Sequence, residues 1–118
     1  EFTKIHKNTV REMATEALKA ELFDKEIINI ALDNIVYKTS VGYLVLTDKR
    51  VLYKGSNLRS HNISIGLNKI NQVKNNLSSG GISNSYLTIE YSGGDETFTV
   101  NNRKENQDFT NACRKLTL

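Results

Sequence analysis

Side chains capable of catalysis or metal binding are few and scattered in this 118-residue sequence. The two histidines, His6 and His61, have no Cys, Asp or Glu at the spacing of a metal site. The single cysteine, Cys113, falls on the apolar stripe of an expected helix, where a cysteine is usually a small buried hydrophobe. Asp95 and Glu96 are neighbours in an expected strand, so they point to opposite faces, and we expect both to be solvated on a hairpin. With no phosphate-binding loop or nucleophile motif present, we expect no enzyme, metal or cofactor.

Basic residues are concentrated in the middle of the chain. Residues 36–75 contain seven Lys or Arg against one acidic residue, whereas residues 76–100 contain none against three. The candidate surface for an anionic ligand consists of Lys38, Lys49, Arg50, Lys54, Arg59, Lys69 and Lys74. Such residues attract anionic lipid by about 1 kcal/mol each near a membrane, or simply keep a small domain soluble. Nucleic acid is an unfavoured partner because no basic run is interleaved with exposed aromatics.

Length and composition describe one ordinary globular domain. The sequence is 38% hydrophobic and 25% charged, and a chain of this length has room for one core. No apolar run approaches the ~20 residues that cross a bilayer. A single cysteine cannot form a disulfide within the chain, so the fold must be stabilised by packing alone. The lack of an internal disulfide is typical of a reducing compartment, and we expect a cytoplasmic protein, free or peripheral to a membrane. The chain does not begin with methionine, and we expect it to be a fragment of a longer protein.

An amphipathic helix is predicted over residues 9–22, starting with a capping-box pattern at Thr9. Its candidate surface for a partner consists of Val10, Met13, Ala17 and Leu18, which share one helical face. This stripe must be buried against the same domain, a second copy or another protein. Packing on the domain and self-association are equally open.

Short runs rich in β-branched and aromatic residues follow, separated by turn residues. Strands are expected at 27–32, 43–47, 51–54, 62–66, 70–75, 87–91 and 97–100. A second helix is expected from Asn102, with an apolar stripe of Phe109, Ala112, Cys113 and Leu116. Seven strands in so small a domain should curl into a barrel or orthogonal sandwich, with the last helix across its mouth.

One stretch carries a family resemblance. It reads Gly42-Tyr43-Leu44-Val45-Leu46-Thr47-Asp48-Lys49-Arg50-Val51-Leu52-Tyr53. The glycine, the alternating strand and the Thr-Asp-x-Arg turn resemble bacterial pleckstrin-homology (PH)-like domains of the YokE-like type and related GRAM domains. The resemblance implies a mainly β (α+β) fold, a PH-like barrel of about seven antiparallel strands capped by a C-terminal helix. The implied division is an N-terminal helix at 1–23 and the barrel at 24–118.

The resemblance also bears on function. Classical PH domains receive phosphoinositide head groups where the first, third and sixth inter-strand loops meet, and the likeness places Lys38 and Arg59 near that mouth. The classical pattern needs basic side chains in the second strand as well, and residues 41–46 have none. We therefore predict a non-enzymatic interaction or adaptor module that binds a protein partner or self-associates, through loops 54–62 and 75–85, a sheet edge or the leading helix. The alternative is peripheral binding to anionic membrane lipid through the basic surface.

Overall fold

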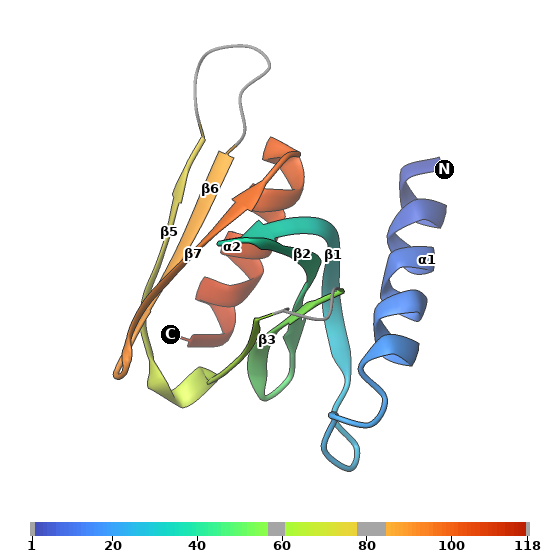
Figure 1. Ribbon diagram of the computed structural model, residues 1–118, viewed down its shortest axis with the longest axis horizontal. Coiled ribbons are helices and arrows are strands. Elements are labelled where there is room, and N and C mark those ends of the chain that lie inside the picture. The colour runs from blue at the N-terminus through green and yellow to red at the C-terminus, as the bar shows by residue number, and fades with distance from the viewer. Residues whose placement is uncertain (1, 57–60, 78–84, 118) are drawn as a thin grey trace.

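A computed structural model describes residues 2–56, 61–77 and 85–117 (Figure 1). The elements are α1 (Phe2–Ala17), β1 (Ile28–Tyr37), β2 (Ser40–Thr47), β3 (Arg50–Gly55), β4 (Asn62–Gly66), the short 3-10 helix η1 (Leu67–Lys69), β5 (Ile70–Asn76), β6 (Ser85–Tyr91), β7 (Gly94–Val100) and α2 (Arg103–Thr117). The strands form one antiparallel sheet in the order β4-β3-β2-β1-β7-β6-β5. This confirms the predicted PH-like plan of seven strands and a C-terminal helix, with an extra helix in front.

The first helix begins and ends earlier than its apolar spacing predicts. It spans Phe2–Ala17 rather than 9–22, so Thr9 lies inside the helix and the predicted start there is wrong. No glycine or proline precedes Thr9 to interrupt the helix, and propensity alone allows it to continue toward the N-terminus. The division of the chain at residues 23 and 24 stays a prediction.

Strand β1 is longer than predicted and bends in the middle. Its register with β2 shifts between Leu32 and Ile35, and Asn34 adopts a φ of 54°. The sequence pattern ends the expected strand before Asp33 and Asn34. In the structure these two residues stay in the strand and form an irregularity of the β-bulge type. Beyond the bend, Val36 pairs with Thr99 of β7. One strand therefore joins the β2–β4 half of the sheet to the β5–β7 half.

The main core lies on the inner face of the bent sheet, beneath α2. Tyr53, Phe98 and Phe109 are each at most 1% exposed there, and Cys113 is also buried. Asn102 caps α2 as predicted, because its Oδ1 accepts a hydrogen bond of 3.0 Å from the backbone N–H of Glu105. Leu116, expected on the buried stripe, is 45% exposed, so the stripe ends one turn earlier.

A second, smaller apolar cluster fixes α1 on the outer face of the sheet. Ala14 and Leu18 pack there against Ile28, Val45 and Leu52. Figure 1 shows α1 alongside β1, whereas α2 contacts β5, β6 and β7. Packing on its own sheet is thus the arrangement that the helix adopts. No described helix is long and apolar enough to cross a membrane.

Candidate functional site

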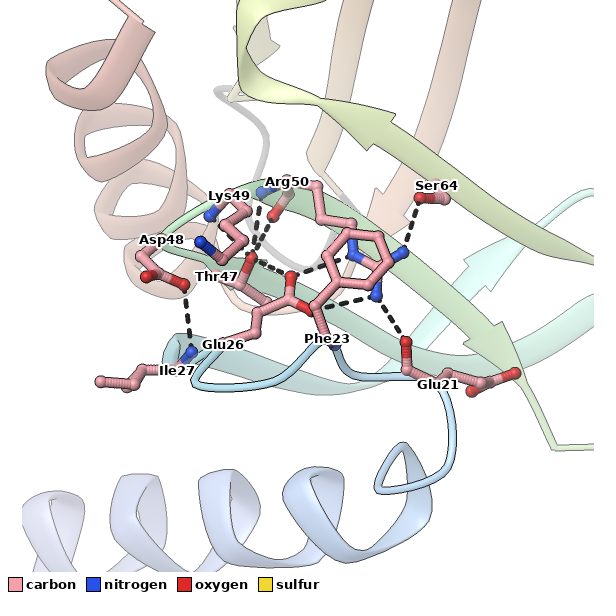
Figure 2. Close-up of polar contacts among 9 residues, drawn as sticks. All are labelled: Glu21, Phe23, Glu26, Ile27, Thr47, Asp48, Lys49, Arg50 and Ser64. Atoms are coloured by element: carbon pink, nitrogen blue, oxygen red, sulfur yellow. Dashed lines mark hydrogen bonds and ion pairs between the residues drawn. The ribbon is translucent and has the colours of Figure 1, made fainter.

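The Thr-Asp-x-Arg turn connects β2 to β3 and holds the segment that follows α1 (Figure 2). Thr47 Oγ1 accepts hydrogen bonds from the backbone N–H groups of Lys49 at 3.0 Å and Arg50 at 2.9 Å, which closes the turn. Asp48 Oδ1 accepts one from the backbone N–H of Ile27 at 3.0 Å. The predicted hairpin is confirmed, and it is tied to the residues just before β1.

Arg50 is the centre of these contacts. Its side chain is 10% exposed, and that of its partner Glu26 is 0% exposed. The Arg50 Nε and Nη2 groups donate to the two Glu26 carboxylate oxygens at 2.9 and 3.0 Å, a bidentate pair. Nη1 donates to Ser64 Oγ at 3.1 Å, and the Phe23 ring lies 3.9 Å from Cζ in a cation–π contact. The guanidinium is therefore engaged within the chain, although the sequence suggested a surface cation.

Glu26 is held in its charged form by this arrangement. Burial opposes ionisation of the carboxyl, but hydrogen bonds from Arg50, from Thr47 Oγ1 at 2.7 Å and from the backbone of Phe23 outweigh it. The pKa of Glu26 consequently lies below its ordinary value of 4.5. We call Glu26, Thr47 and Arg50 the clamp, because together they fasten the α1–β1 connection to the sheet.

Sequence reasoning missed Glu26 altogether. A usable signal existed in the expected strand order, because the start of the first strand of a meander lies beside the end of the second. The structure pairs Ile28 with Thr47 in this way. Glu26, two residues before Ile28, therefore lies next to the Thr-Asp-x-Arg turn.

The other residues of the candidate anionic-ligand surface lie in several environments. Lys54 forms an ion pair with Glu21 at 3.0 Å, and Lys74 forms one with Glu90 at 2.6 Å. Lys38 Nζ lies 5.3 Å from the centroid of the Tyr37 ring. The remaining three are Lys49 and Lys69, which are exposed, and Arg59, which lies outside the described residues. Internal partners thus neutralise part of the predicted surface.

An acidic side chain of β7 is hydrogen-bonded by the tyrosines that end β1 and β6. The Glu96 carboxylate accepts hydrogen bonds from the hydroxyls of Tyr37 and Tyr91, the latter at 2.6 Å. The His61 ring meets the Tyr37 ring edge-on, with centroids 5.6 Å apart. Glu96 is half-buried, so its expected place on a solvated hairpin is wrong. Its alternation with the buried Phe98 is the signal that could have placed it inward.

The two tyrosines stay protonated at neutral pH. Burial, reinforced by Glu96, raises the pKa of Tyr37 to about 12, and the hydrogen bond to Glu96 raises that of Tyr91. A carboxylate at this position disfavours a phosphate group by like-charge repulsion.

Groups for catalysis or metal binding do not gather in the part of the chain that the structure describes. No set of three His, Cys, Asp or Glu side chains there could hold a metal ion. Cys113 is buried, and burial raises the pKa of its thiol to about 11. The thiol is thus protonated in the core and poorly suited to act as a nucleophile.

A groove of about 200 Å³ is lined by residues of α1, β1 and α2. Val10 and Ile30 contribute to its apolar lining. Lys7 of α1 and Asp108 of α2, which also line the groove, form an ion pair of 3.3 Å. Of the candidate partner surface on α1, Val10 and Leu18 are buried, whereas Met13 and Ala17 are exposed.

Comparison with solved structures identifies the fold. No family model and no curated protein matches the sequence. The crystal structure of a pleckstrin homology domain from Shewanella amazonensis SB2B matches with a TM-score of 0.68 and 14% identity, over 91% of this chain and 87% of that one. The chain has a PH fold.

Further structures share this PH fold. A DUF1696 family protein with a pleckstrin-homology domain from Shewanella loihica PV-4 matches with a TM-score of 0.66 and 14% identity, over 91% of this chain and 92% of that one. The Vps36 N-terminal PH domain matches with a TM-score of 0.59 and 15% identity, over 81% and 82%. Such likeness shows a shared PH fold and leaves the ligand to be argued from the site. The YokE-like and GRAM resemblance of the turn stays a prediction.

Proposed function

We propose that this PH-fold chain is a non-enzymatic interaction module that recognises protein through the edge of its sheet. The observation that carries the proposal is strand β4, Asn62-Ile63-Ser64-Ile65-Gly66, which is an outer strand without charge or proline. It pairs with β3 along its whole length, and no described element pairs with its other side. A strand edge presents N–H and C=O groups that an extended segment of another protein can bind.

The opposite edge of the sheet is guarded. Strand β5 carries Lys74 near its middle, and α2 packs against this strand. Arg114 of α2 donates from Nε to the backbone carbonyl of Val73 in β5 at 2.9 Å. Charged side chains and covering helices are devices that prevent unwanted strand addition. Strand β4 has neither among the described residues, so it is the edge suited to a partner.

Charge also favours a protein partner over anionic lipid. Arg50 belongs to the clamp, Lys54 and Lys74 have acidic partners, and the Glu96 carboxylate beside Tyr37 and Tyr91 repels an anionic group. Acidic partners within the chain thus take up three of the seven residues of the predicted basic surface. Residues 57–60 and 78–84 of the loops 54–62 and 75–85, to which the sequence pattern assigns specificity, lie outside the described residues. Their role and a cytoplasmic location stay predictions.

Affinity capture with edge variants tests the proposal. The immobilised wild-type chain, Asn62→Lys and Val41→Lys are each exposed to an extract of the source cell. Asn62 and Val41 are both exposed strand residues, but Val41 lies in β2, an internal strand. Wild type and Val41→Lys should retain the same protein, and Asn62→Lys should lose it, because a lysine blocks an edge.

Co-sedimentation with phosphatidylserine vesicles tests the alternative on the same preparations. We expect no binding that grows with the acidic lipid content and fades with salt. Salt-sensitive vesicle binding, together with capture that Asn62→Lys leaves intact, would show that the proposed function is wrong.

A further inference from the structure

We infer that the strand which adds to β4 is β4 of a second copy, antiparallel and centred on a two-fold axis at Ser64. The inference rests on the proposed function and names its partner. It is an isologous contact, in which the same surface is used by both copies. The result would be one sheet that continues from one copy into the next.

The structure holds β4 ready for such a contact. Five consecutive residues pair with β3, from Asn62 opposite Lys54 to Gly66 opposite Arg50. Ser64 Oγ also accepts the 3.1 Å hydrogen bond from the clamp residue Arg50. The outer edge is therefore presented in a fixed extended conformation, and pairing requires little further ordering of the backbone.

The side chains of β4 are complementary to themselves in this register. Ile65 is 2% exposed on the inner face and Ile63 is half-buried, whereas Asn62 and Ser64 are exposed. A two-fold axis at Ser64 sets Ile63 opposite Ile65 of the second copy and Ser64 opposite its own counterpart. Apolar residues then meet on one face and hydroxyl groups on the other, and both kinds of pair stabilise an antiparallel ladder.

Charge distinguishes β4 from β5 as the site of self-pairing. Antiparallel self-pairing about the middle of a strand brings a charge near that middle close to its own copy, which is destabilising. Strand β4 contains no charged residue, whereas β5 contains Lys74 and has the Arg114 side chain on its Val73 carbonyl. Two copies can thus join through β4 without burying a charge or displacing a side chain from the edge.

Sedimentation equilibrium over a concentration series tests the inference. Wild type and Val41→Lys should show a reversible monomer–dimer equilibrium. Asn62→Lys should raise the dimer dissociation constant roughly tenfold or more, because it puts a lysine on the edge. A wild-type chain that is monomeric at every concentration, or an Asn62→Lys variant that dimerises as well as wild type, would overturn it.

Single cysteines on the same strand test the register. Under oxidised glutathione, Ser64→Cys should form a disulfide-linked dimer, since the two residues face each other. Asn62→Cys is the matched control, because the two copies of that position lie four residues apart along the ladder, about 13 Å, well beyond the ~7 Å Cα separation that a disulfide can span. The native Cys113 is buried and does not compete. Linkage of Asn62→Cys, or none of Ser64→Cys, would overturn the register.

Failure of the inference can be told from failure of the proposed function. A monomeric wild-type chain whose capture of a different protein is abolished by Asn62→Lys overturns self-pairing and leaves edge recognition standing. A monomeric chain whose capture does not depend on the edge contradicts both.

Discussion

At the scale of single residues, the clamp depends on the Glu26 carboxylate, which is fully buried, and the Arg50 guanidinium, whose side chain is 10% exposed. Removing Glu26 leaves Arg50 buried without its anion, a change that costs several kcal/mol in proteins. We expect Glu26→Ala to lower the free energy of unfolding by about 3–5 kcal/mol, measured by urea denaturation.

A solvent-exposed ion pair supplies the control. Lys54 and Glu21 have side chains 36% and 39% exposed, and exposed pairs contribute less than about 1 kcal/mol. Lys54→Ala should therefore change stability far less than Glu26→Ala does. Equal losses in the two variants would contradict the structural role of the clamp.

The Tyr37 hydroxyl gives the protein a dependence on alkaline pH. Its pKa is about 12 in the fold, against 10.0 for an ordinary tyrosine, so the folded state holds this proton more tightly. Its contribution to stability is complete below pH 10 and is lost as the pH rises from 10 toward 12. The urea midpoint should fall over this interval, and less steeply in Tyr37→Phe. Parallel curves for the two proteins would exclude the assigned contribution of Tyr37.

At the scale of elements, α1 is a part of the fold and not a free arm. Leu18, the residue directly after α1, is 1% exposed in the apolar cluster on the outer face of the sheet. Met13 in the middle of the helix is 54% exposed. Leu18→Ala should cost about 2–5 kcal/mol of unfolding free energy, and Met13→Ala should stay within about 0.5 kcal/mol of wild type. Urea denaturation of both variants checks this. Similar small effects would mean that the helix is not docked on the sheet.

The strands were the more predictable elements. Alternating apolar residues bounded by Gly, Asn and Asp located β4 with its observed limits and every other strand except β1 to within three residues, because both signals are local. The length of β1 was not predictable in this way, because the residues around Asn34 remain in the strand only through the bulge and the pairing beyond it. The start of α1 was missed because an internal threonine and glutamate imitate a cap.

At the scale of the whole molecule, the fold could be predicted from the sequence, but the partners of the charged side chains could not. Arg50 reads as a surface cation because its partner Glu26 is 24 residues away in the sequence, and only the sheet order brings the two together. The sequence suggests a solvated Glu96 for the same reason, since its partner Tyr37 is 59 residues away in the sequence and only the pairing of β1 with β7 brings the two together. Sequence analysis therefore overstated the basic surface and gave no preference between the two sheet edges.

Hydrogen exchange at low and high protein concentration tests the central claim, that β4 is the edge through which two copies of this PH-fold chain pair. We expect exchange of the amides in Asn62–Gly66 to slow several-fold as concentration rises, because pairing protects an edge strand. Exchange in Ile70–Asn76, where Arg114 and α2 already cover the edge, should not change. Unchanged exchange in β4, or slowing confined to β5 or α1, would contradict self-pairing through β4.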